Sequence, residues 1–140
     1  GDTMGLLTDV LPHVDYFMPS MEEAAFLSGK SEPAEIAETF RAMGAGACIF
    51  KWGARGSYVH SGAERFRVPG FRVKVSDTTG CGDSYCGGFV AGLAMGRSLR
   101  DACLLGTTTS ALVATGLGSD AGVVDLAQVE AFAAATERLD

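Results

Sequence analysis

The sequence is short of positive charge. Eleven lysine and arginine residues stand against 17 aspartate and glutamate residues, which gives a net charge of −6 and an isoelectric point of about 4.8. An acidic protein repels the phosphate backbone of nucleic acid, so nucleic acid is not an expected partner. An anionic ligand would have to be held by local geometry rather than by the overall field.

Long apolar runs are also missing. The longest are broken by glycine, so the sequence shows neither a signal peptide nor a membrane span. The cysteines lack the spacing of zinc ligands. Cys48, Cys86 and Cys103 lie in apolar or helical stretches, which favours buried reduced thiols, and Cys81 lies in a loop where any small residue would serve. These features predict a cytoplasmic protein.

What the sequence does contain is the pattern of one α/β domain. The chain of 140 residues is long enough to bury about two-thirds of its unfolded surface, and it shows no repeat or linker. Helical periodicity alternates with short apolar stretches, which is typical of a sheet flanked by helices. We therefore expect a three-layer domain with a mostly parallel sheet over residues 1–140.

Capping residues and glycines mark the ends of the predicted elements. Ser20 and Glu23 form a capping box, and Ser98 and Asp125 each begin a later helix. The stretches on either side of 61–63 alternate polar and apolar residues and predict a hairpin. The predicted helices cover residues 6–11, 21–27, 33–43, 83–94, 98–114 and 125–133, and the predicted strands cover 16–18, 47–50, 57–60, 64–68 and 71–75.

The stretch that organises the chain is the loop 77–83, between the predicted strand 71–75 and a helix. The first N–H groups of a helix lack intrahelical acceptors and lie at the positive end of its dipole, so this turn suits an anion. Its spacing fits neither a dinucleotide fingerprint nor a P-loop.

Two interpretations of this loop remain open. In the first, the glycines only turn the chain and Asp83 only caps the helix. In the second, the loop is a phosphoryl-transfer site. Free amides at Gly80, Cys81 and Gly82 would neutralise the phosphoryl group, and Asp83 would take a proton from an attacking hydroxyl.

The same loop carries a family resemblance. Residues 77–84, Asp-Thr-Thr-Gly-Cys-Gly-Asp-Ser, closely resemble the C-terminal signature of the ribokinase-like (PfkB) carbohydrate kinases, which usually has alanine where this chain has Cys81. Segments 19–23 and 51–56 before this signature and segment 116–122 after it resemble further segments of that family and occur in the same order. The resemblance covers essentially the whole chain but only the C-terminal half of a typical member. It implies that the N-terminal substrate and lid half is absent and that this chain alone is an inactive, weakly ATP-binding fragment.

The resemblance implies ATP-dependent phosphorylation of a hydroxyl on a sugar or a sugar-like small molecule. Asp83 matches the catalytic base, and the backbone of Gly80, Cys81 and Gly82 matches the anion hole that faces the γ-phosphate. A membrane has no part in this activity, and a homodimer of the full-length protein is an option that the resemblance leaves open.

Residues of three segments match the nucleotide-binding residues of the family. Lys51, Gly53 and Gly56 match the segment that lies along it, where glycine permits a close backbone approach. The loop 115–122, which includes Gly116 and Gly118, matches the one that helps enclose the nucleobase. Thr79, within the signature, belongs to the same set.

Glu23 matches the glutamate that helps order Mg²⁺ and phosphate through water. The asparagine usual in that motif is Ser20 here. The capping-box interpretation of these two residues is at least as well supported, and for Glu23 the two roles are compatible.

A monovalent cation such as K⁺ is a further option. Asp77, Thr79 and the carbonyls of Val113 and Gly118 fall at the positions of its ligands, whereas Gly122 lacks the hydroxyl that sometimes contributes.

Two histidines and a tryptophan remain outside these motifs. His13 and His60 have no partner motif, so we expect both on the surface. Trp52 is expected to pack, with stacking on adenine as the alternative. The second candidate function is a non-catalytic nucleotide-binding or assembly module derived from such a kinase, supported by Ser20 in place of asparagine.

Overall fold

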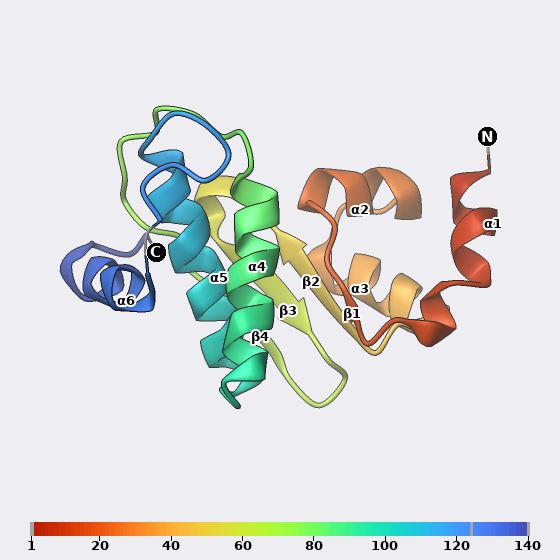
Figure 1. The fold of residues 1–140 in the computed structure, drawn as a ribbon. Helices are drawn as coiled ribbons and strands as arrows, with labels where there is room; N and C mark the ends of the chain where they lie inside the picture. The colour runs from red at the N-terminus through yellow and green to blue at the C-terminus, as the bar shows by residue number, and fades with distance from the viewer. Residues whose placement is uncertain (1, 124, 140) are drawn as a thin grey trace. The chain divides into compact units, whose positions relative to one another are not determined.

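The computed structural model describes residues 2–123 and 125–139, which contain a four-stranded sheet and six α-helices (Figure 1). The strands follow chain order across the sheet: β1 (Tyr16–Phe17), β2 (Ala47–Lys51), β3 (Ser57–His60) and β4 (Arg65–Val68).

Strand pairing in the sheet is mixed. β1 and β2 are parallel, with Tyr16 opposite Ala47. The connections 52–56 and 61–64 are too short for the crossover that a parallel pair requires, so β3 runs antiparallel to both of its neighbours. The expected parallel pairing therefore holds at β1–β2, and the hairpin around 61–63 is confirmed.

The chain folds into two compact units. The first comprises Gly1–Trp52 with Tyr58–Arg67, and the second comprises Gly53–Ser57 with Val68–Asp140. Besides most of the sheet, the first unit contains α1 (Thr3–Thr8), a 3₁₀ turn at Leu11–His13, α2 (Met21–Ser28) and α3 (Pro33–Ala42).

Aromatic rings fill the core of the first unit. Phe40 is fully buried, with its ring centroid 4.8 Å from that of Phe17 and 6.4 Å from that of Phe50. Tyr58 stacks on Phe50 from the next strand. Trp52 packs against this core and its ring faces the Arg67 guanidinium, which agrees with the expected packing role.

The helix boundaries of the first unit follow from local chemistry. Ser20 caps α2 by accepting from the Glu23 amide, and the Glu23 carboxylate accepts from the Ser20 amide in return, so the capping box is confirmed. Gly29 ends α2 in the left-handed region at φ +67°. Pro33 begins α3, where its missing N–H costs nothing.

The second unit is built on a close helix pair. It contains a 3₁₀ turn at Gly53–Arg55, α4 (Cys81–Ala94), α5 (Leu99–Ala114) and α6 (Leu126–Ala135). α4 and α5 run side by side (Figure 1). A Cβ at Gly92 would lie 2.8 Å from Ala102 Cα, and one at Gly106 would lie 2.7 Å from the Tyr85 carbonyl oxygen. These backbones approach so closely because glycine has no side chain.

The caps expected for α5 and α6 are confirmed. The Ser98 hydroxyl accepts from the Asp101 amide, and the Asp125 carboxylate accepts from the Gln128 amide. The predicted strand 71–75, by contrast, is wrong. In the structure Phe71 forms an isolated bridge with Arg138, because the backbone of 70–72 pairs with residues 137–139 instead of joining the sheet.

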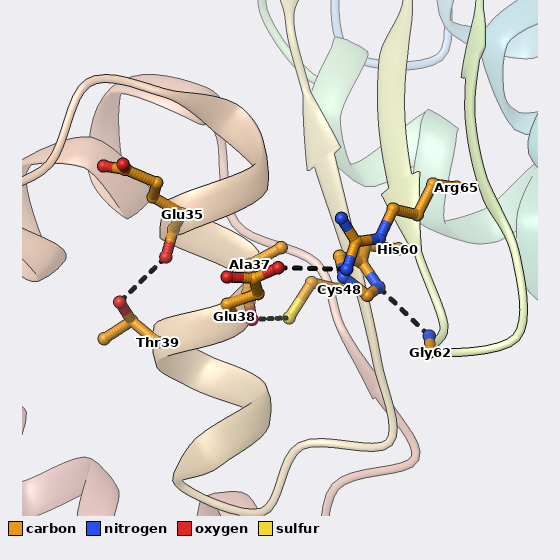
Figure 2. A network of polar contacts seen from close by, with 8 residues as sticks. All are labelled: Glu35, Ala37, Glu38, Thr39, Cys48, His60, Gly62 and Arg65. Atoms are coloured by element: carbon orange, nitrogen blue, oxygen red, sulfur yellow. Dashed lines mark hydrogen bonds and ion pairs between the residues drawn. The ribbon is translucent and has the colours of Figure 1, made fainter.

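His60 is buried, which corrects the expectation of a surface position, whereas His13 is exposed as expected. The His60 Nδ1 atom accepts from the Gly62 amide at 3.0 Å within the hairpin, as the dashed line in Figure 2 shows. The neighbouring Arg65 forms an ion pair with Glu38. A short local hydrogen bond thus turns this imidazole inward.

Within the described residues, no helix combines the length and the apolar character that crossing a membrane would require.

Candidate functional site

The N-terminus of α4 begins at a glycine that cannot be replaced without strain. Gly80 is the N-cap residue, with φ +76°. A Cβ at this position would lie 2.5 Å from the Ser119 carbonyl oxygen, so the loop after α5 presses directly on the signature loop. Unlike Ser98 or Asp125, Gly80 offers no side-chain acceptor to the first turn of its helix.

Three amides at this helix end are left unpaired. Among the described residues, no acceptor faces the N–H groups of Gly80, Gly82 and Asp83. The Cys81 amide, expected to be free, donates to the Thr78 carbonyl at 3.2 Å because the turn is tight there. Asp83 lies in the first turn with its side chain exposed. Free donors and the positive end of the helix dipole make this end suited to an anion.

Asp77 joins the signature loop to the loop after α5. Its Oδ1 accepts from the Thr79 amide at 2.9 Å and from the Thr79 hydroxyl at 2.8 Å, and its Oδ2 accepts from the Gly118 amide at 3.2 Å. The hydrogen bonds from Thr79 and then from Gly118 lower the pKa of Asp77, so the carboxylate stays charged at neutral pH. These contacts bring Asp77 and Thr79 together with the amide of Gly118, the residue whose carbonyl is an expected cation ligand.

The fourth expected cation ligand, Val113, lies near the C-terminus of α5, where its carbonyl accepts from the Gly116 amide. The Asp77 carboxylate supplies negative charge, and the carbonyls supply neutral oxygens with a second lone pair, so these residues offer the oxygen chemistry that a monovalent cation takes. In the part of the chain that the structure describes, no cluster of three acidic, histidine or cysteine side chains forms a metal site.

The turn 53–56 is fixed by its own glycines. Gly53 has φ +53° and Gly56 has φ +83°. A Cβ at Gly56 would lie 1.9 Å from the Val68 carbonyl oxygen, and one at Gly70 would lie 2.1 Å from the Ala54 carbonyl oxygen. The turn and the segment 68–70 therefore lie backbone against backbone. A Cβ at Gly53, by contrast, would meet nothing within 4 Å.

In the first unit, the structure brings together the two segments that hold Glu23 and Lys51. Ser20 forms a parallel bridge with Lys51 at the end of β2. Hydrogen bonds from the Ser20 backbone and side chain, with the Lys51 charge, lower the pKa of Glu23. Glu23 Oε2 accepts from the Ser20 amide, and no described group donates to its other oxygen. One available carboxylate oxygen fits Mg²⁺ held through water.

Sequence reasoning missed two contacts of the site. One is the Ser119 carbonyl, which also accepts from the Ser84 hydroxyl at 3.3 Å. The other is a buried hydrogen bond from the Tyr85 hydroxyl to the Ser57 hydroxyl at 2.8 Å. A signal for the second was present, because Tyr85 is the one hydroxyl on an otherwise apolar helix face.

The second unit also contains a pocket with a volume of about 460 Å³, lined mainly by apolar side chains. Its wall includes Ser84, which follows Asp83 in the first turn of α4, and Asp120, which lies in the expected nucleobase loop 115–122. Val113, an expected cation ligand, lines it as well, whereas Gly80–Gly82 and Asp83 are not among its lining residues.

Comparison with known proteins identifies the family. The pfkB family carbohydrate kinase profile matches residues 1–125. The 2-dehydro-3-deoxygluconokinase of Bacillus subtilis is 30% identical over 130 residues, which cover 92% of this chain and 40% of that protein. The chain therefore spans less than half the length of this relative.

Solved structures show the same fold. A ribokinase from Thermotoga maritima superposes with a TM-score of 0.84 at 31% identity, covering 89% of this chain and 44% of that one. A putative ribokinase II from E. coli, in complex with ATP and Mg²⁺, gives a TM-score of 0.83 at 31% identity and covers 92% and 42%. The fold is thus ribokinase-like, and the chain belongs to the pfkB family of carbohydrate kinases.

Proposed function

We propose that this chain is the nucleotide-binding and catalytic half of an enzyme that transfers a phosphoryl group from ATP to a hydroxyl of a sugar or sugar-like molecule. The observation that carries the proposal is the uncapped end of α4, where three unpaired amides lie beside the exposed Asp83 carboxylate. An anion hole and a proton acceptor occur there in one helical turn.

Asp83 acts as the general base. It accepts the proton of the attacking hydroxyl while the new O–P bond forms and the bond to the ADP oxygen breaks. The amides of Gly80, Gly82 and Asp83 donate to the phosphoryl oxygens as their charge develops. Cys81 holds the turn in shape through its hydrogen bond to Thr78.

The nucleotide is held by backbone groups and by the positive charge of one lysine side chain. Gly53 and Gly56 form a turn along which the nucleotide lies, and Lys51 supplies a positive charge. Gly116 and Gly118, in the loop joined to Asp77, help to enclose the nucleobase, with Thr79 on the adjoining turn. Glycine at these positions leaves the backbone open to the ligand.

Two cations are part of the proposal. Glu23 would hold Mg²⁺ through water with its available oxygen, and Asp77, Thr79, Val113 and Gly118 would hold a monovalent cation. Bound Mg²⁺ would neutralise charge on the phosphates of ATP. The ATP and Mg²⁺ in the E. coli neighbour support the use of ATP with Mg²⁺, and the choice of Glu23 rests on the resemblance and on its available oxygen.

The acceptor is a small molecule bound largely by residues outside this chain. The B. subtilis relative and the T. maritima ribokinase are each more than twice as long as the stretch they share with it. The whole enzyme is needed to supply the sugar site.

Replacing Asp83 with asparagine in the longer protein tests the proposal. Asp83→Asn keeps the shape of the side chain and removes the proton acceptor. We expect kcat to fall by about 10²- to 10⁴-fold while ATP affinity holds, measured by a coupled ADP assay and by calorimetry. Unchanged turnover would contradict the proposal. If neither the variant nor the parent protein shows kinase activity, the result favours a non-catalytic nucleotide-binding module.

Asp101→Asn is the matched control. Asp101 occupies the same third position of α5 that Asp83 occupies in α4, but α5 is capped by the Ser98 hydroxyl, which accepts from the Asp101 amide, whereas α4 has no side-chain cap. Its replacement should leave kcat unchanged, so a loss in both variants would point to helix stability and not to base catalysis.

A further inference from the structure

One buried hydrogen bond joins the helix of the base to the strand that follows the nucleotide turn. The Tyr85 hydroxyl donates to the Ser57 hydroxyl at 2.8 Å. Tyr85 is 2% exposed and Ser57 is fully buried, so water cannot replace either partner. Burial also raises the pKa of Tyr85, which keeps the phenol protonated and able to donate.

A shift of the 53–56 turn would move Ser57, because Ser57 is the next residue in the chain. It directly follows Gly56, whose backbone is pressed against Val68 in a conformation that only glycine adopts easily. A Cβ at Gly53 would meet nothing within 4 Å, and the Gly53 carbonyl accepts from the Gly56 amide within the turn. The contact with 68–70 and the hydrogen bond of the Ser57 hydroxyl both help to hold the turn in place.

Tyr85 is equally fixed. It lies two residues after Asp83 in α4, and its ring packs over Gly106 of α5, where an added Cβ would lie 3.2 Å from ring carbons. The missing side chain at Gly106 is what makes room for the ring. The Tyr85 hydroxyl therefore has little freedom to move relative to α4, and its hydrogen bond to Ser57 ties Ser57 to that helix.

We propose that Tyr85 and Ser57 are positioning residues that hold the 53–56 turn in register with the helix that carries Asp83. The inference rests on the proposed function, in which that turn lies along ATP and Asp83 receives the proton. Its consequence is that the geometry of the nucleotide relative to the base depends on a hydroxyl pair that touches neither ATP nor the sugar.

The energetics predict a particular pattern among variants. Removing one hydroxyl breaks the hydrogen bond of the pair: Ser57 loses the Tyr85 hydroxyl as its partner, and Tyr85 keeps Cys103 and Thr107 nearby. Once one hydroxyl is gone, removing the second breaks no further hydrogen bond between the two. Tyr85→Phe and Ser57→Ala should therefore each disturb the turn, and the double variant should disturb it no more than either single one. This non-additivity distinguishes a working pair from two independent packing residues.

The experiment compares these three variants in the longer protein. We expect each single variant to raise KM for ATP about 3- to 10-fold, with kcat changed less than about twofold, because ATP positioning is lost and proton transfer is kept. The ATP dissociation constant from calorimetry should rise in parallel and does not depend on turnover. If Tyr85→Phe does not fold, Ser57→Ala and the double variant carry the same test.

Tyr58→Phe is the matched control. Tyr58 follows Ser57 in β3 and stacks on Phe50, so its change removes a phenol hydroxyl without touching the proposed pair. It should leave KM for ATP unchanged. The proposal is overturned if the pair variants lower the unfolding midpoint but leave KM and ATP affinity at parent values, or if the single effects simply add. A parent protein without kinase activity would instead count against the proposed function.

Discussion

The two compact units of this chain bury their residues in opposite ways. The first unit is filled by large rings, with Phe40 in contact with Phe17 and Phe50. In the second unit, α4 and α5 meet where side chains are missing, at Gly92 and Gly106.

Because the two units are packed differently, they should tolerate different substitutions. A large buried ring stabilises by the area it removes from water, so the first unit should be sensitive to deletion. A glycine at a helix contact stabilises by letting two backbones approach, so the second unit should be sensitive to addition. The backbone turns that we assign to ATP lie in the unit of the second kind, where close approach is already built in.

Deleting a ring from the first unit should have the largest effect. Phe40→Ala removes a fully buried side chain from the centre of the aromatic cluster. We expect the free energy of unfolding to fall by about 3–5 kcal/mol, from lost burial and the cavity left behind, measured by urea denaturation. A loss below about 1 kcal/mol would mean that the neighbouring rings collapse into the space, and the contrast between the units would fail.

Adding a methyl group to the second unit should have a smaller effect. Gly106→Ala forces a Cβ to within 2.7 Å of the Tyr85 backbone oxygen, which cannot move independently of α4. We expect the free energy of unfolding to fall by about 1–3 kcal/mol.

Gly87→Ala is the control for that addition. Gly87 also lies within α4, but a Cβ there meets nothing within 4 Å. Alanine at this exposed helical position should stabilise the protein by about 0.5–1 kcal/mol because it restricts the unfolded chain. If both substitutions changed stability in the same direction, helix propensity would explain the result and close packing would not.

The mildest test changes pH. Burial, followed by the nearby charges of Arg65 and Arg41, lowers the pKa of His60 below its ordinary value of about 6.5. The unfolded chain therefore takes up this proton more readily than the folded one. Stability should fall as pH is lowered from about 6.5 toward the folded-state pKa and should level off below it.

His60→Asn checks that pH dependence. Asparagine keeps an acceptor for the Gly62 amide but does not titrate, so the slope of stability against pH should become flatter in this window. His13 is present in both proteins and cancels from the comparison. An unchanged slope would assign the effect to other groups.

Local chemistry explains which elements the sequence could predict. Ser20, Ser98 and Asp125 cap their helices by accepting from amides three residues further along the chain, and such signals need no knowledge of the rest of the fold. The strand expected at 71–75 failed because its backbone partner is 137–139, at the other end of the second unit. His60 failed because one amide two residues away turns its ring inward.

The candidate site divides in the same way. The loop 77–83 could be found from its glycines and carboxylates, since a helix end and its charges are encoded locally. The ties of Asp77 to Gly118 and of Tyr85 to Ser57 span 41 and 28 positions of the sequence, and no local pattern reveals them. Sequence thus locates the groups to which we assign chemistry, and packing determines how firmly they are held.

The bare end of α4 has a thermodynamic consequence. A helix whose first amides find no acceptor in the protein is stabilised by whichever anion occupies it, so part of the stability of the second unit is supplied by the ligand. The folded population then rises with ligand concentration according to the ligand's affinity. A serine at Gly80 could not supply the missing cap without strain, because φ there is +76° and its Cβ would lie 2.5 Å from the Ser119 carbonyl oxygen.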